Sequence, residues 1–113
     1  MGKDSLRVGV LGIGSMGRHH VRNARALDGF DLVAVADPSG DRFGVAGDLE
    51  VLPSVEALID AGVDAVIVAV PTVYHEDAAL KLAAAGVHTM IEKPLSESVE
   101  SGQRIADAEA VQV

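Results

Sequence analysis

The feature that most constrains the fold is a turn of three glycines between a predicted strand and a predicted helix. Residues 12–17 read Gly-Ile-Gly-Ser-Met-Gly, which matches the pattern G-x-G-x-x-G. The aliphatic run 6–11 precedes the turn, and residues 16–27 follow it with a helical composition. In a chain with 12 glycines the pattern alone says little. Its position after a strand and at the start of a helix predicts a turn that binds phosphate groups.

Each glycine of the turn has its own expected task. Gly12 permits the tight turn, Gly14 lets the backbone approach a pyrophosphate, and Gly17 allows the helix to pack closely on the strand. Backbone N–H groups and the partial positive charge at the helix start then bind the phosphates. The predicted cofactor-binding residues of the turn are Gly12, Ile13, Gly14, Ser15, Met16 and Gly17.

An acidic residue follows the second predicted strand. Residues 31–36 read as this strand, and Asp37 stands directly after it. A carboxylate in this place accepts hydrogen bonds from the ribose of an adenosine and repels a 2′-phosphate, so the expected cofactor is NAD, with NADP as the other possibility. S-adenosylmethionine enzymes also combine a glycine-rich turn with such an acid, but the third glycine favours a dinucleotide. A purely structural turn is the remaining alternative.

The rest of the chain alternates between strands and helices. Residues 65–70 are apolar at every position, as in a strand covered by helices on both faces. Residues 41–47 hold at most one helical turn, because glycines interrupt them. The other expected elements are an edge strand at 50–52, a short helix capped by Ser54, a helix at 75–85 ended by Gly86, a strand at 88–92 and a helix at 96–110 capped by Ser96. This alternation predicts an α/β fold with a doubly wound parallel sheet in three layers, αβα.

Charge and aromatic content argue against nucleic-acid binding. The chain has 9 Lys and Arg against 17 Asp and Glu, a net charge of −8, and only 3% aromatic residues. Arg18, Arg22 and Arg25 share one face of the first helix and are expected to be solvated.

Length and residue types set further bounds. The 113 residues are expected to form one domain, residues 1–113. The lack of cysteine excludes disulfides and Cys-ligated zinc, and no Asp, Glu and His cluster has metal-ligand spacing. The longest uncharged stretch, 65–75, is too short to cross a membrane, so a cytoplasmic domain is expected.

The second half of the chain carries motifs of one particular family. Residues 70–75 read VPTVYH, residues 85–88 read AGVH, and residues 92–95 read EKPL. With these motifs the chain resembles the cofactor domain of the glucose–fructose oxidoreductase and inositol dehydrogenase family, usually called Gfo/Idh/MocA. The resemblance covers residues 6–110, and Glu-Lys-Pro at the end of the fifth parallel strand is its most specific element.

The resemblance implies roles for particular residues. It places cofactor contacts at Arg42, Pro71, Thr72, His75, Glu92 and Lys93. Lys93 is implied to be catalytic, because its ammonium would hydrogen-bond the reacting oxygen while hydride moves. Arg42 would lie over the adenine. The alternatives are a packing role for His75 at the start of its helix and a plain surface position for Lys93.

The function implied is that of an NAD(P)-dependent oxidoreductase. In a longer protein, hydride would pass between nicotinamide and a hydroxyl or ketone of a sugar, inositol or similar polyol. The family's second α/β domain, which carries the substrate pocket, would follow this chain, so the 113 residues alone are expected to be inactive. Without that domain one edge of the sheet would be open, and pairing at this edge is expected to give a homo-oligomer. The rival hypothesis is a nucleotide-binding or NAD-sensing module without turnover. A methyltransferase is disfavoured by Glu92-Lys93-Pro94.

Overall fold

One parallel sheet organises the chain. The computed structural model describes residues 5–15, 17–91 and 98–110. Five strands lie in the order β3-β2-β1-β4-β5, and every pairing is parallel. The elements are β1 (Leu6–Leu11), α1 (Gly17–Ala26), β2 (Phe30–Ala36), β3 (Val51–Leu52), α2 (Val55–Asp60), β4 (Ala65–Val68), the 3-10 turn η1 (Thr72–Tyr74), α3 (His75–Ala84), β5 (His88–Ile91) and α4 (Val99–Ala110). This topology confirms the predicted doubly wound α/β sheet.

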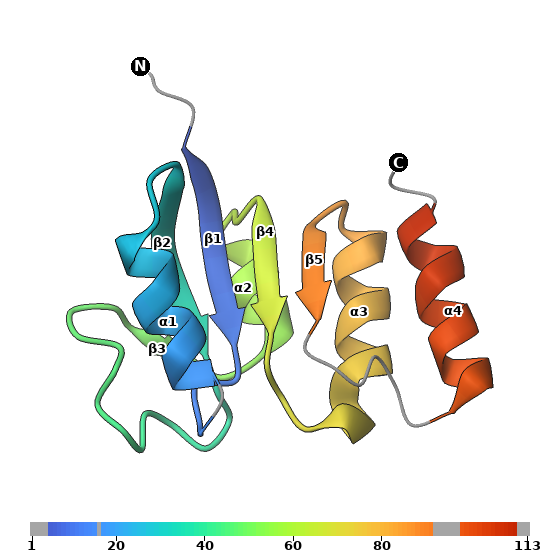
Figure 1. Ribbon diagram of the computed structural model, residues 1–113, viewed down its shortest axis with the longest axis horizontal. Helices are drawn as coiled ribbons and strands as arrows, with labels where there is room; N and C mark the ends of the chain where they lie inside the picture. Colours follow the sequence, from blue (N-terminus) through green and yellow to red (C-terminus); the bar gives the residue numbers. More distant parts are fainter. Residues whose placement is uncertain (1–4, 16, 92–97, 111–113) are drawn as a thin grey trace.

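Helices cover both faces of the sheet. On one face α1 packs on β1 and β2, and on the other α2 and α3 pack on the strands and on each other. Helix α4 packs against α3 at the end of the domain beside β5 (Figure 1). The three-layer αβα arrangement is therefore confirmed. Within the described ranges, no helix is both long enough and apolar enough to span a bilayer.

The central strands are buried on both sides. In β4, Ile67 packs in the core on the α1 side, whereas Val66 and Val68 pack in the core on the side of α2 and α3. In β1, Gly9 leaves room for α2, because an added Cβ would lie 3.0 Å from Leu58 Cδ2. Burial on both faces explains the uninterrupted apolar run of β4, which a sheet open to water on one side would not require.

The end of β4 and both ends of α3 lie at or near their predicted positions. Strand β4 ends at Val68, two residues before the predicted end, and the last sheet-like hydrogen bond runs from Ala69 N–H to the Leu11 carbonyl at 2.8 Å. Pro71 follows and has no N–H with which to continue the ladder. Helix α3 begins at His75 as predicted and is ended by Gly86, whose φ is +76°.

Helix α4 begins later than predicted. Its first residue is Val99, and the Ser98 hydroxyl accepts a hydrogen bond from Ser101 N–H at 3.0 Å, as an N-cap does. Ser96, the predicted cap, lies outside the described residues. Arg104 joins α4 to α3 by donating from Nε and Nη2 to the two oxygens of Glu76, at 2.6 and 2.9 Å. This guanidinium lowers the pKa of Glu76 from 4.5 to about 2, with a smaller contribution from the Ser101 hydroxyl.

The segment 41–49 has no helix, yet it is firmly bonded. The Asp41 carboxylate accepts hydrogen bonds from Val45 and Ala46 N–H, both at 2.9 Å. Arg25 of α1 donates to the carbonyls of the same two residues, at 2.8 and 2.5 Å. The Arg25 side chain is exposed, as predicted, but it also satisfies loop carbonyls that no regular element satisfies. The two Asp41 bonds fix the shape of the loop, and the two Arg25 bonds fix it against α1.

Candidate functional site

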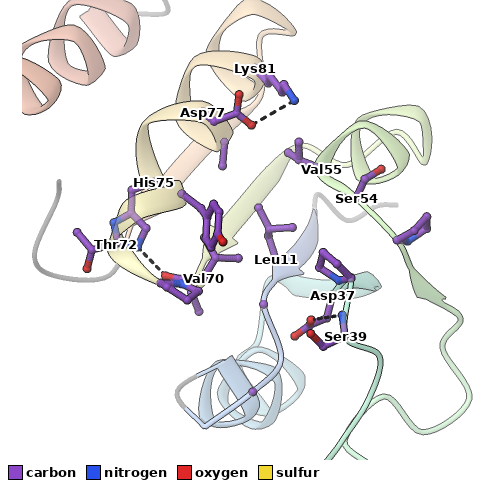
Figure 2. A pocket seen from close by; sticks show the side chains of 18 of the residues that line it. Leu11, Asp37, Ser39, Ser54, Val55, Val70, Thr72, His75, Asp77 and Lys81 are labelled. Atoms are coloured by element: carbon purple, nitrogen blue, oxygen red, sulfur yellow. Dashed lines mark hydrogen bonds and ion pairs between the residues drawn. The ribbon is translucent and has the colours of Figure 1, made fainter. Parts of the chain in front are cut away.

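A cleft opens at the carboxyl edge of the sheet. The strand order reverses between β1 and β4, which is the place where doubly wound sheets bind ligands. The arrowheads of β1, β4 and β5 point to this edge in Figure 1. The cleft has a volume of about 1050 Å³. Figure 2 labels part of its lining, including Asp37, Thr72 and His75. The lining includes Gly12, Gly14, Ser15, Asp37, Ser39, Arg42, Ser54, Pro71, Thr72, Tyr74, His75 and Lys81.

The three glycines of the turn have different surroundings. At Gly12, where φ is +91°, an added Cβ would lie 2.8–2.9 Å from backbone atoms of Ala69 and Val70. At Gly17 an added Cβ would overlap the Gly12 carbonyl, so this glycine closes the turn on itself rather than only packing helix against strand. At Gly14 the one atom of the described residues, chain neighbours aside, within 4 Å of an added Cβ is Arg42 Nη2, at 3.3 Å. The second glycine therefore faces the cleft, and the other two serve the turn.

The turn presents hydrogen-bond donors to the cleft. Gly14 N–H and Ser15 N–H have no acceptor among the residues that the structure describes. Both lie just before α1, where the helix dipole adds positive potential. Arg18 N–H already donates to the Gly14 carbonyl at 3.0 Å, which begins the helical hydrogen bonding. An anion that approached Gly14 would meet two donors and, of the side chains that the structure describes there, the Arg42 guanidinium.

Asp37 holds the turn as well as facing the cleft. Its Oδ2 accepts from Ile13 N–H at 3.0 Å, and its Oδ1 accepts from Ser39 N–H at 2.8 Å. Each carboxylate oxygen has a second acceptor position, so both can still take a hydroxyl. The Ile13 side chain is fully buried in the core on the α1 side and lies outside the cleft lining given by the described residues. Its contribution to the site is the N–H that fixes Asp37.

The connection from β4 to α3 forms the opposite wall. His75 is 1% exposed, and its Nε2–H donates to the Val70 carbonyl at 2.8 Å, so its ring is engaged within the fold. Tyr74 N–H donates to the Pro71 carbonyl at 2.9 Å, and these two bonds hold the segment that places Pro71 and Thr72 on the cleft. Tyr74 also lines the cleft and is 60% exposed. Sequence reasoning missed this aromatic side chain, although its place inside the VPTVYH motif could have suggested it.

An ion cluster lines the part of the cleft between α2 and α3. Lys81 of α3 pairs with Glu56 of α2 at 2.6 Å and with Asp77 at 3.1 Å, and Figure 2 shows the latter pair. The Glu56 carboxylate, followed by Asp77, raises the pKa of Lys81, and Lys81 in turn lowers the pKa of Glu56. The cluster joins α2 to α3 across the cleft wall. Both carboxylates and the ammonium are partly exposed, so we give this cluster a positioning role only.

The structure does not test the predicted roles of several residues. Met16, Glu92 and Lys93 lie outside the described residues, so the catalytic role of Lys93 stays a prediction. Arg42 lies beside the glycine turn; whether it contacts an adenine is likewise a prediction. In the described part of the chain no group of three His, Asp or Glu side chains is arranged to hold a metal ion.

Comparisons with known proteins point to the same chemistry. Residues 6–112 match the family described as "Oxidoreductase family, NAD-binding Rossmann fold". The chain is 36% identical over 112 residues to an inositol 2-dehydrogenase of Arthrobacter sp. (strain FB24), covering 94% of this chain and 33% of the relative. It matches the structure of UDP-N-acetylglucosamine 3-dehydrogenase GnnA from Acidithiobacillus ferrooxidans with a TM-score of 0.85 and 34% identity, over 96% of this chain and 36% of that one.

A further solved structure contains a cofactor. The WlbA dehydrogenase from Bordetella pertussis, in complex with NADH and UDP-GlcNAcA, matches with a TM-score of 0.86 and 26% identity, over 96% of this chain and 35% of that one. The chain therefore spans about a third of the length of the proteins it resembles.

Proposed function

The chain belongs to the oxidoreductase family with an NAD-binding Rossmann fold, and on this premise we propose that it is the cofactor-binding domain of an NAD-dependent dehydrogenase. One observation supports this most. Among the described residues, the space beside Gly14 in the cleft is approached only by the flexible end of the Arg42 side chain, and the N–H groups of Gly14 and Ser15 lie next to it. A pyrophosphate needs this combination of close backbone approach and donors.

The chain's own residues have distinct tasks in this proposal. Gly14 and Ser15 donate to the pyrophosphate, and Asp37 accepts from the adenosine ribose through the acceptor positions that Ile13 and Ser39 leave open. His75 is a positioning residue, because its bond to the Val70 carbonyl holds the wall on which the cofactor lies. When bound, the nicotinamide supplies the hydride acceptor or donor. Lys93 would hold or move the proton at the reacting oxygen, as the resemblance implies.

The substrate class follows from the relatives. One is named an inositol dehydrogenase and another a dehydrogenase of UDP-N-acetylglucosamine. We therefore propose that the whole protein oxidises a hydroxyl of a polyol or sugar, or reduces the matching ketone. Because the chain spans only about a third of such relatives, the residues that choose the substrate are expected outside it.

Cofactor choice gives the direct experiment. The Asp37 carboxylate occupies the place that a 2′-phosphate would need, so we expect NAD to bind more tightly than NADP. Calorimetric titration of the 113-residue chain with both cofactors tests this. Tighter binding of NADP would overturn the preference, and binding of neither would overturn the proposed function. As a control, Asp77→Asn changes a carboxylate of the cleft away from the glycine turn and should leave the ratio of the two affinities unchanged.

A further inference from the structure

Two arginines gather around one exposed aromatic ring beside the glycine turn. The guanidinium carbon of Arg18 lies 4.6 Å from the centroid of the Phe43 ring, and that of Arg42 lies 5.4 Å from it. Phe43 is 44% exposed and belongs to neither core cluster, so burial does not explain its position. The contacts are those of cation–π pairs.

The surroundings hold this group in place. Arg18 is the second residue of α1, and its Nε donates to the Ser15 carbonyl at 3.2 Å. Phe43 lies within the loop that Asp41 bonds internally and that Arg25 bonds to α1. The ring is thus fixed next to the first turn of α1. Arg42, its neighbour in the chain, extends from there to the glycine turn.

The charges of the two arginines are not balanced locally. Lys81 and Arg104 have carboxylate partners, but neither Arg18 nor Arg42 forms an ion pair with any described residue. Arg7, Arg22 and Arg25 likewise form no ion pair with the described residues, but Arg18 and Arg42 are brought together at one ring. Two guanidinium groups at one ring repel each other, and a bound anion would relieve that repulsion.

The position of the Arg42 guanidinium indicates which anion it binds. Its Nη2 lies 3.3 Å from the place where a Cβ on Gly14 would lie, and no other atom of the described residues, chain neighbours aside, comes within 4 Å of that place. The same space is the one through which a pyrophosphate approaches the turn. We infer that Arg42 binds the cofactor's pyrophosphate, and that Phe43, together with Arg18, positions it there. This inference rests on the proposed function and replaces the expectation that Arg42 covers the adenine.

A ligand series separates a phosphate contact from a base contact. NAD, ADP and adenosine are titrated into the unsubstituted chain and into Arg42→Gln, with Arg22→Gln as the control, because Arg22 lies one turn farther along α1 and is exposed. Charge-assisted hydrogen bonds are strong enough for the loss of Arg42 to weaken NAD and ADP by about tenfold or more. Adenosine, which lacks phosphate, should change by less than about twofold, since it offers no partner to the guanidinium.

Variants of Phe43 test the positioning role. Phe43→Leu should weaken NAD and ADP in the same pattern as Arg42→Gln but less, and Phe43→Tyr should restore both, because it keeps the ring. Thermal unfolding of each variant shows that the fold is intact. Equal losses for adenosine and ADP in Arg42→Gln, or a Phe43→Leu chain that binds NAD normally, would overturn the inference alone. An unsubstituted chain that binds neither NAD nor ADP would overturn the proposed function with it.

Discussion

Substitutions at two glycines of the same turn should separate stability from binding. At Gly12 a side chain must adopt a φ of +91° and accept a Cβ 2.8 Å from the Ala69 carbonyl carbon. The left-handed conformation costs about 1–2 kcal/mol, and the overpacking about 1–3 kcal/mol. Gly12→Ala should therefore lose roughly 2–5 kcal/mol of unfolding free energy. In a domain of this size that lowers Tm by about 10 °C or more.

At Gly14 the expected result is the opposite. In the part of the chain that the structure describes, the neighbour of a new Cβ is the far end of the flexible Arg42 side chain, so Gly14→Val should change stability by less than about 1 kcal/mol. The new side chain fills the space of the pyrophosphate and prevents the donation from Gly14 and Ser15. At about 1.5–3 kcal/mol for each charge-assisted bond, NAD binding should weaken by roughly a hundredfold or more.

The assay is thermal unfolding followed by circular dichroism, with calorimetric titration of NAD on the same samples. A Gly14→Val chain that binds NAD as the unsubstituted chain does would refute the assignment of the turn as the phosphate site. A Gly12→Ala chain with an unchanged Tm would refute the claim that Gly12 is required for the fold of the turn whereas Gly14 is required for binding.

Four further predictions concern pH, salt, association and turnover. The folded-state pKa of Glu76 lies at about 2, below the ordinary value of 4.5, so its bond to Arg104 stabilises the fold above pH 4.5 and is lost as pH falls from there toward 2. The urea midpoint of Glu76→Gln should therefore depend less on pH in this range than that of the unsubstituted chain. Identical pH profiles for the two chains would contradict the coupling. With a net charge of −8, Tm should rise from dilute buffer to molar KCl, and a constant Tm would count against self-repulsion. The 113 residues should self-associate through the β5 edge, where Met90 is 58% exposed, and a monomer in sedimentation would contradict this. The same chain should not oxidise inositol or glucose, and measurable turnover would contradict that expectation.

The local signals in the sequence sufficed for the sheet and the turn. A run of apolar residues, a glycine turn and a helix start are adjacent in the chain, so their meaning does not depend on distant contacts. Strand β4 and the end of α3 at Gly86 were predictable for the same reason. The predicted end of β4 is two residues too late, because Ala69 and Val70 are apolar but line the cleft instead of continuing the strand.

The contacts that shape the cleft could not be predicted in this way. Arg25 read as a solvated residue because its carbonyl partners, Val45 and Ala46, belong to a loop without periodicity. The gathering of Arg18 and Arg42 at Phe43 likewise joins a helix to that loop. The sequence alone does not decide whether His75 packs within the fold or contacts the cofactor. Its burial and its bond to the Val70 carbonyl, which engage the ring within the fold, are contacts between residues that no local pattern predicts.

The central claim is that a dinucleotide binds in the cleft at the carboxyl edge of the sheet. Amide chemical-shift mapping of the ¹⁵N-labelled chain during an NAD titration tests it most directly, because it reports the position of the ligand residue by residue. The account predicts saturable shifts concentrated at Gly12, Gly14, Ser15, Asp37 and Ser39. Shifts concentrated on α4 and the far edge of the domain, or no shifts at all at saturating NAD, would contradict it.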